Sequence, residues 1–565
     1  MRGRRLIQVI LLVAAVVPYF VNLGGTSIID ANEAFYTETP REMIESGNYI
    51  SPTFNYEPRL NKPPLSYWAV AASYRAFGVS LGAARLPIAL GALVILLTAY
   101  FIGRLAFSAN AGLIAVITLA AAPRVLLFSR RIIIDIYTTM FVGLALLLFA
   151  LAEAEGKPVR RRWWLLGMYV AIGLGVLTKG PVAVAIPAIA FTGYLAASGR
   201  LRTIRHLMLP TGAAVVAAIV VPYYAALYAQ EGWGAIASFI VQENVARYTS
   251  GVGAPDRGLL FYLPVVFADF YLPWSLLLPA ALALVAWRSV AAGAGWSRVW
   301  GAPGAEEPVS QERLRLLLGL WIVLIVVFFS LSNGQQDLYV LPFVVAGAPL
   351  VGGLIAGWVD GAWSPRLDRF TSWSVGAAAV VLLVAGAVVG WFVGRPGGRI
   401  HLSGAAGAGL VLAAGGAAAF AAMNRRARVA ALTSLMAATI VSLWVVIGWS
   451  FPDFERYKPV PQLARIISQA AVPPEAVCTY RVAAPSLVFY LHRHVAQLFE
   501  PDELEGFLRA HPHGVCVTRG EDYDAVRPQL TTPTRVLAGA PRVETRLADF
   551  LGRSPLRILV LIGAD

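Results

Sequence analysis

The run "LIQVILLVAAVVPYFVNL", residues 6–23, is apolar over a length that can cross a membrane, and it follows three arginines near the N-terminus. The stretch "IIDANEAFYTETPREM", residues 28–43, comes shortly after it and is rich in carboxylates. We interpret the apolar run as a retained signal anchor, because it is long for a signal-peptide core and no convincing small-residue cleavage site follows it. The acidic stretch then belongs to an external loop, residues 24–84.

The composition excludes a soluble globular protein. Of 565 residues, 58% are hydrophobic and only 14% are charged, which is typical of a polytopic membrane protein. The net charge is +14, but the Lys and Arg residues stand in short clusters between apolar runs. This pattern orients membrane helices, so membrane lipids are expected partners and nucleic acid is not. The two cysteines, Cys478 and Cys516, are compatible with one disulfide or with two buried thiols.

Apolar runs near the length of about 20 residues that spans roughly 30 Å of hydrocarbon recur along the chain. We therefore expect a multi-pass α-helical membrane protein with about thirteen transmembrane helices. The predicted spans are residues 6–23, 85–105, 109–125, 135–153, 163–178, 181–198, 207–229, 259–287, 315–332, 337–359, 372–394, 403–422 and 428–450. The Ala/Gly-rich spans 372–394 and 403–422 are expected to pack closely.

The segment "LSYWAVAASYRAF", residues 65–77, decides the side on which every later loop lies. It is short for a span, contains Arg75 and is rich in Tyr and Trp, which favours an interfacial helix. With the N-terminus inside, this interpretation places 20 Lys and Arg residues before residue 451 on the cytoplasmic side and 13 outside. The positive-inside rule supports it, because a span at 65–77 would move the clusters at 157–162 and 425–428 outside.

A second helix is predicted earlier in the same external loop. Glu38, Arg41, Glu42 and Glu45 follow one another at spacings of three and four residues. Residues with these spacings share a helix face, and a charged face is normally solvated. We expect an amphipathic helix there that lies on the membrane surface.

The chain changes character after residue 450, so we divide it into a transmembrane domain, residues 1–450, and an extracytoplasmic domain, residues 451–565. In the second part the charge rises. Short apolar runs such as "AVCTY" and "LRILVLI" alternate there with helix-like stretches such as "DELEGFLRAH". This alternation predicts a small α/β domain.

Polar residues from six external loops or helix ends gather on one side of the predicted membrane. Charged groups at membrane depth are costly unless they pair or line a hydrated cavity, so this convergence predicts a functional site. The residues are Asp30, Glu33, Lys62, Arg130, Arg131, Asp135, Lys179, Arg247, Gln335, Gln336 and Asp337. For any single residue the alternative is an ordinary loop charge near the lipid headgroups.

Several motifs, in order along residues 28–345, resemble those of a known family. The run "NEAFYTETPREMIESGNYISPTFNYEPRLNKPPLSYW", residues 32–68, is similar to the first external loop of membrane GT-C glycosyltransferases of the protein O-mannosyltransferase and aminoarabinose transferase type. The likeness continues in "SRRIIIDIYTTMF", "GLGVLTKGPVAVAIP", "ENVARYTSG" and "FFSLSNGQQDLYVLP". The resemblance implies the GT-C architecture.

The resemblance also implies an activity. Such enzymes use polyprenyl-phosphate sugars as donors on the periplasmic face of the bacterial inner membrane, where nucleotide sugars are absent. An acceptor hydroxyl or phosphate on a lipid such as lipid A, on a glycan or on a protein attacks the anomeric carbon, and the polyprenyl phosphate leaves. This chemistry requires a carboxylate to take the proton and cations to stabilise the leaving phosphate. The alternatives are a lipid-linked sugar flippase, which would favour midplane polar groups and internal repeats, and an inactive relative that binds the lipid-linked sugar.

Three carboxylates are implied as catalytic residues. The Asp-Glu pair of the family aligns with Asn32 and Glu33, and an amide cannot act as a base, so Asp30 is the expected substitute. The alternative for Asp30 is a helix cap or a turn residue. Glu33 matches directly and is expected to bind the sugar or to support Lys62. Asp135 matches the aspartate of the second loop and is expected to orient Lys62 or to bind the acceptor, with a salt bridge to the neighbouring arginines as the alternative.

The cationic side of the site is implied in the same way. Lys62 matches the lysine of the family's Lys-Pro-Pro element, and a snorkelling lysine is the alternative. The residues expected to bind the donor phosphate or other parts of the substrates are Asn32, Lys62, Arg131, Lys179, Arg247 and Tyr339.

Two departures from the family remove candidate metal ligands. Asn61 stands where a glutamate is common, and Asn244 lies in a loop where relatives have a histidine. We therefore expect no metal site and no tightly bound cofactor, with a weak requirement for magnesium or manganese left open. Relatives also often carry a lysine where this chain has Gln335 and Gln336, which indicates a changed polar group on the donor or the acceptor.

Overall fold

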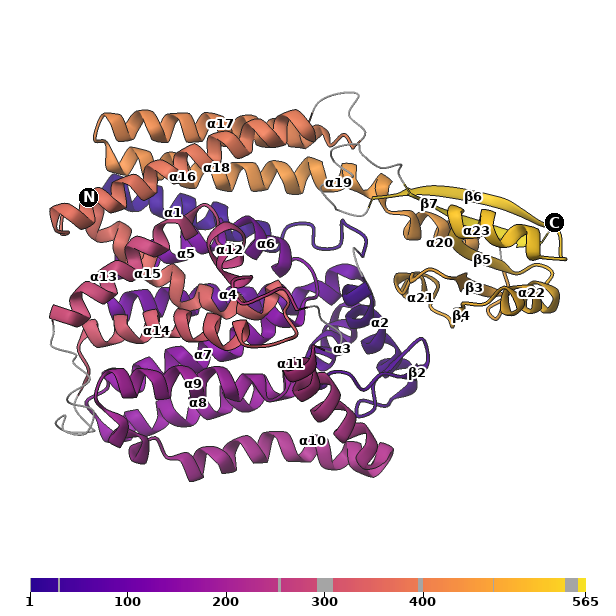
Figure 1. Cartoon of the computed structure of the whole chain (residues 1–565), viewed down its shortest axis with the longest axis horizontal. Coiled ribbons are helices and arrows are strands. Elements are labelled where there is room, and N and C mark those ends of the chain that lie inside the picture. The colour runs from indigo at the N-terminus through magenta and orange to yellow at the C-terminus, as the bar shows by residue number, and fades with distance from the viewer. Residues whose placement is uncertain are drawn as a thin grey trace.

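The computed structural model describes residues 2–28, 31–251, 256–291, 308–394, 400–470, 472–543 and 557–564. Its larger part is a bundle of helices with the N-terminus at one end, and a small sheet lies beyond the opposite end (Figure 1). The main helices of the bundle are α1 (Arg2–Val16), α4 (Leu81–Ala106), α5 (Ala109–Ala120), α6 (Pro123–Ser129), α7 (Ile134–Ala154), α8 (Pro158–Lys179), α9 (Val182–Ala197), α10 (Leu209–Ala237), α12 (Tyr262–Ala268), α13 (Leu278–Ala291), α14 (Gln311–Ser330), α15 (Val344–Val359), α16 (Pro365–Phe392), α17 (Ser403–Asn424) and α18 (Arg428–Val445).

The described helices confirm a multi-pass helical membrane fold. Eight of them are long and apolar enough to cross a membrane, or up to nine if α5 and α6, bent by 70°, form one span. Three further apolar helices are shorter, at Arg5–Tyr19, Val182–Ala197 and Trp274–Trp287. Twelve of the predicted spans fall on these helices or on α8. The span predicted at 259–287 is wrong as a single helix, because turns at 269–273 divide it into α12 and the helix at Trp274–Trp287. The count of thirteen stays a prediction.

Close packing of the Ala/Gly-rich helices α16 and α17 is confirmed. A methyl group added at Gly386 would overlap the carbonyl oxygen of Gly409 on the facing helix, and one at Gly416 would overlap that of Ala379. Glycines at these positions therefore let two backbones approach to a distance that larger residues forbid.

The first external loop folds into two helices with a hairpin between them. Helix α2 (Ala31–Ser46) is followed by the strands β1 (Thr53–Phe54) and β2 (Glu57–Pro58) and by α3 (Leu65–Phe77). The helix expected at 65–77 thus has the predicted bounds, and Gly78 ends it with a φ of 79°. Its place at the membrane interface stays a prediction.

The expected solvation of the charged face of α2 is wrong. Glu38 is fully buried, Glu42 is 1% exposed and Arg41 is 9% exposed. The charges are compensated locally, because the Arg41 guanidinium bonds the Glu38 carboxylate at 2.6 Å and the Glu45 carboxylate at 2.8 Å. The Glu42 carboxylate accepts a hydrogen bond from the Thr53 hydroxyl. The physical reason is tertiary, since α2 packs against α3, the hairpin and the C-terminal part of the chain.

The residues after 450 form a mixed five-stranded sheet with helices around it. Its strands lie in the order β4 (Ala496–Leu498), β3 (Val477–Tyr480), β5 (Val515–Arg519), β7 (Arg557–Ala564) and β6 (Thr534–Arg542), together with the helices α20 (Pro459–Gln469), α21 (Ser486–Leu491), α22 (Pro501–Ala510) and α23 (Gly520–Val526). Strand β3 is parallel to β4 and β5, and β7 is antiparallel to both of its neighbours. Cys478 and Cys516 are register partners on β3 and β5 and are buried free thiols.

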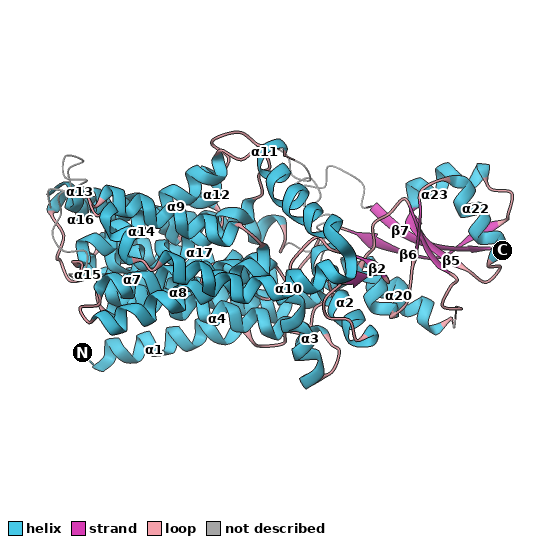
Figure 2. Cartoon of the chain, turned by 90° about the horizontal axis from the view of Figure 1, so that it is seen from below, coloured by secondary structure: helices cyan, strands magenta, loops and turns pink. Residues whose placement is uncertain are grey.

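The sheet part is attached to the first external loop, as Figure 2 shows from the side. The Asn55 amide exchanges two hydrogen bonds with the backbone of Val495, at 3.0 and 2.9 Å. The backbone N–H of Ile28 donates to the Tyr490 hydroxyl at 2.8 Å, and Phe54 is buried in the apolar core on one face of the sheet. The loop that carries most of the predicted catalytic residues is therefore held between the bundle and the sheet.

Candidate active site

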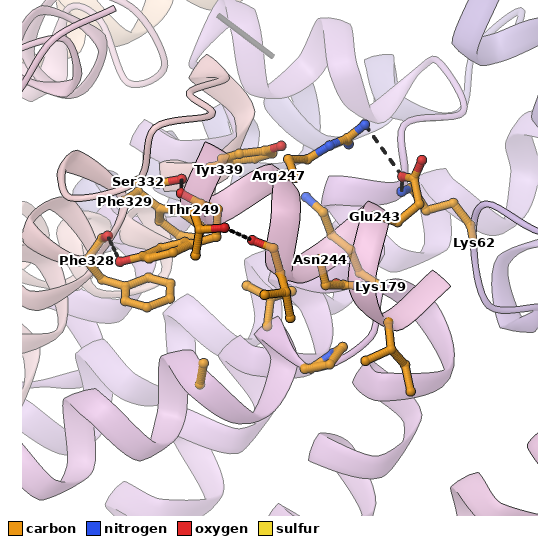
Figure 3. A pocket seen from close by; sticks show the side chains of 16 residues that line it. Lys62, Lys179, Glu243, Asn244, Arg247, Thr249, Phe328, Phe329, Ser332 and Tyr339 are labelled. Atoms are coloured by element: carbon orange, nitrogen blue, oxygen red, sulfur yellow. Dashed lines mark hydrogen bonds and ion pairs between the residues drawn. The ribbon is translucent and has the colours of Figure 1, made fainter. Parts of the chain in front are cut away.

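A cavity of about 320 Å³ opens at the end of the bundle that faces the sheet. Its walls come from the loop before α3, the start of α9, a π-helical stretch at Ser238–Ala246 with the short helix α11 (Arg247–Ser250), the end of α14, and a 3₁₀ turn at Asp337–Phe343. The lining residues are Lys62, Lys179, Pro181, Val182, Ala185, Ile240, Glu243, Asn244, Val245, Arg247, Tyr248, Thr249, Phe328, Phe329, Ser332 and Tyr339. Most of this wall is apolar, and three cations lie among it (Figure 3).

Four of the predicted substrate-binding residues meet in this cavity. Lys62, Lys179, Arg247 and Tyr339 come from four separate parts of the chain and all line it. The Lys179 ammonium lies 4.8 Å from the centre of the Tyr339 ring, within the range of a cation–π interaction. The structure thus brings together residues that the family resemblance had grouped as substrate-binding.

Two cations of the cavity share one carboxylate. The Lys62 ammonium bonds Oε2 of Glu243 at 2.7 Å, and the Arg247 guanidinium lies 3.5 Å from the same oxygen. All three side chains are between 18% and 25% exposed. Burial lowers the pKa of Lys62, and the bond to Glu243 opposes this shift. Glu243 was missed by sequence reasoning, although it stands four residues before Arg247 on one helical face, which is an available signal.

Asp135 lies beside this cavity and forms an ion pair with Lys179. The sequence had suggested Lys62 or the neighbouring arginines as its partner. Asp135 stands in the first turn of α7 and Lys179 ends α8, two helices that pack side by side. Gly180 follows with a φ of 87°, and a Cβ there would press on the Phe239 ring, so a glycine permits the close approach of the π-helical stretch.

The turn that carries Tyr339 is anchored by a second charge cluster. Arg124, which follows the bend between α5 and α6, forms ion pairs with Asp269 and Asp337. Asp337 is the first residue of the turn. Nearby, the side chain of Gln335 accepts a hydrogen bond from the backbone N–H of Arg257 at 3.1 Å, so this glutamine positions the backbone at Arg257.

Glu33 lies away from the cavity lining and is paired with Arg85. Nε of Arg85 bonds Oε1 of Glu33 at 2.7 Å, and both side chains are only 1% exposed. The same guanidinium donates to the carbonyl oxygens of Leu23, Thr26 and Ser27, at 2.8, 2.7 and 3.2 Å. Sequence reasoning missed Arg85, which stands within a predicted span and offered no local signal for this partner.

Two other predicted residues, Asn32 and Arg131, lie elsewhere, and Asp30 lies outside the described residues. Asn32 is exposed on the first turn of α2. Arg131 does not line the cavity of Lys62 and Arg247. It borders a separate cavity of about 500 Å³ between the first external loop and the sheet part, together with Lys458 and Arg542.

Metal-binding side chains do not cluster in the described part of the chain. Nowhere in it do three His, Cys, Asp or Glu residues come close enough together to hold a metal ion. At one of the two positions discussed above, the Asn244 amide donates a hydrogen bond to the carbonyl oxygen of Phe239 at 2.8 Å. The expected absence of a metal site stays a prediction.

Comparison with known proteins gives a consistent result. Residues 61–225 match the family described as dolichyl-phosphate-mannose-protein mannosyltransferase. The chain is 29% identical over 365 residues to undecaprenyl phosphate-alpha-4-amino-4-deoxy-L-arabinose arabinosyl transferase 1 of Pseudomonas fluorescens (strain Pf0-1), covering 62% of this chain and 58% of that one. It is also 29% identical over 399 residues to the corresponding transferase of Pectobacterium carotovorum subsp. carotovorum (strain PC1), covering 68% and 65%. The chain thus spans about six tenths of the length of these relatives.

Solved structures show the same fold over nearly the whole chain. The crystal structure of ArnT from Cupriavidus metallidurans bound to undecaprenyl phosphate matches with a TM-score of 0.74 at 22% identity, covering 98% of this chain and 97% of that one. The archaeal oligosaccharyltransferase AglB from Archaeoglobus fulgidus matches with a TM-score of 0.51 at 13% identity, covering 93% and 70%. Taken together, residues 61–225 are similar to the protein mannosyltransferases, a larger part of the chain is similar to the aminoarabinose transferases, and the fold is that of ArnT.

Proposed function

We propose that the protein transfers a sugar from a polyprenyl-phosphate donor to an acceptor on the periplasmic side of the bacterial inner membrane and releases polyprenyl phosphate. The observation that carries this proposal is the cavity at Lys62, which combines cations with an apolar wall. A polyprenyl phosphate needs both, because its head is an anion and its tail a hydrocarbon. Ile240 and Val245 of the wall are also 39% and 52% exposed, so the apolar surface continues outward, where lipid would lie.

The proposed reaction assigns a role to each side of the site. The acceptor oxygen forms a bond to the anomeric carbon while the bond from that carbon to the phosphate oxygen breaks. Lys62 and Arg247 stabilise the departing phosphate, because preorganised cations act most strongly where negative charge develops. A carboxylate takes the acceptor proton. Glu33 and Asp135 already serve as partners of Arg85 and Lys179, so we retain Asp30 as the proposed base.

The proposed acceptor is lipid A, the acceptor class implied by the similarity to aminoarabinose transferases, with a glycan or a protein hydroxyl as the alternatives. No tightly bound metal is included in this proposal. A flippase is a weaker candidate, since Lys179 is the last residue of α8 and Lys62 lies in the loop before α3, while transporters hold their substrate near the membrane midplane.

The test is a release assay with purified protein in liposomes. Undecaprenyl-phosphate sugars with a labelled lipid are supplied with lipid A, glycan or protein acceptors, and free undecaprenyl phosphate is measured. Lys62→Ala should abolish release, while Lys157→Ala, an exposed lysine at the opposite end of the bundle, should leave it unchanged. Donor binding without release would indicate the binding relative, and donor movement between leaflets without release would indicate the flippase.

A further inference from the structure

Glu243 lies in the cavity that the proposed function assigns to the lipid donor, between two of its cations. Among the described residues that line the cavity, Glu243 is the only one with a carboxylate. Its Oε2 contacts both Lys62 and Arg247. The third cation of the lining, Lys179, already has Asp135 as a partner. The two cations that face the cavity in front of Glu243 therefore share a single negative charge supplied by the protein.

A phosphate and this carboxylate compete for the same donors. Both are anions with oxygens that accept charge-assisted hydrogen bonds from Lys and Arg. In the empty cavity, partly buried cations are costly without a counter-ion, which explains why a carboxylate stands there. Once a phosphate is bound, the two anions would lie against one another at a partly dehydrated site and repel. Glu243 must then release at least one of its cations.

The backbone around Glu243 allows such a change. Glu243 lies in the π-helical stretch Ser238–Ala246, a rare geometry that is frequent at functional sites. Glycines with positive φ stand on both sides, Gly232 at 73° and Gly251 at 71°. The stretch is thus set between two points at which the helix direction is broken.

We propose that Glu243 is the resident counter-ion of the empty donor site, and that the phosphate of the lipid displaces it from Lys62 and Arg247. This inference rests on the proposed function. Before transfer, Glu243 weakens the binding of the lipid phosphate. After transfer, Glu243 takes back the two cations and so speeds the release of polyprenyl phosphate.

The test measures the affinity of the purified full-length protein for undecaprenyl phosphate. Glu243→Gln removes the charge and keeps the shape, so binding should become roughly tenfold tighter, which corresponds to loss of a competitor worth about one charge-assisted hydrogen bond. Turnover should fall because the product leaves more slowly. The matched control is Glu231→Gln, which changes a glutamate near the end of α10. Glu231 accepts a hydrogen bond from the Ser51 hydroxyl at 2.6 Å and does not line the cavity, so this variant should bind as the wild type does.

A second variant guards against a folding artefact. Glu243→Ala also removes the charge and should tighten binding as well, with an unchanged elution volume in size-exclusion chromatography. Binding by folded Glu243→Gln that equals or falls below that of the wild type would overturn the inference, because Glu243 would then merely position Lys62. Tighter binding by the variant without any sugar transfer by the wild type would support the counter-ion and reject the proposed function.

Discussion

The buried pair of Glu33 and Arg85 yields the sharpest prediction, because it separates a structural role of Glu33 from the catalytic role that the family resemblance implies. Both side chains are 1% exposed, and removal of one partner from a buried pair costs about 3–5 kcal/mol. Glu33→Gln keeps an acceptor oxygen and should lie near the lower end of this range. Arg85→Met also leaves three backbone carbonyls without their donor and should lie near the upper end.

The double variant and a control make the prediction quantitative. Glu33→Gln combined with Arg85→Met removes both charges, so its cost should be less than the sum of the single costs by about 2 kcal/mol. The control is Glu45→Gln, which changes a glutamate of the same helix that is 54% exposed. Arg41 keeps Glu38 as a partner in this variant, so the cost should be about 0–1 kcal/mol.

The assay is the loss of folded protein on heating in detergent, followed by size-exclusion chromatography at one fixed heating rate, since membrane proteins seldom unfold reversibly. From most to least stable, the predicted order is Glu45→Gln, then Glu33→Gln, then Arg85→Met. Sugar transfer is measured on the folded fraction of each variant. Glu33→Gln with the stability of the wild type but no transfer would refute the reasoning, because Glu33 would then act on the substrate.

Further predictions concern charge and packing. Burial lowers the pKa of Lys62, so donor binding should weaken as the pH rises, and at a lower pH than for an exposed lysine. Lys62→Arg should retain donor binding up to a higher pH. The measurement is donor affinity titrated against pH. Burial raises the pKa of Glu42 from 4.5 to about 7. The folded state therefore holds this proton more tightly than the unfolded chain, and the protein should lose stability as the pH rises from 4.5 to about 7. Glu42→Gln should reduce this loss in thermal stability measured against pH. Asp30→Asn should abolish transfer without loss of stability, and near-normal transfer would remove it as the proposed base. Gly386→Val should lower stability by several kcal/mol in the same heating assay, because the facing backbone leaves no room for its side chain.

Local features of the sequence were sufficient to predict individual helices, but they did not predict which charged residues pair with one another. The helix at 65–77 was predicted with its observed bounds, and the close packing of two Gly-rich helices followed from their composition. The charged face of α2 was predicted to be solvated, and Glu38 and Glu42 are instead buried. The spacing of these residues is the same for a solvated and for a buried helix face, so only the elements that pack against α2 could decide which of the two forms.

The stretch at residues 6–43 and the apolar runs after it determined by themselves that the chain is a multi-pass helical membrane protein, because the length and polarity of a segment decide whether it can enter hydrocarbon. The tertiary structure alone decided which charges meet. Lys62 pairs with Glu243, which is 181 residues away in the sequence, and Glu33 pairs with Arg85, which is 52 residues away. An ion pair acts over a few ångströms and depends on which helices pack together, and that choice is made by the whole bundle rather than by the sequence near either residue.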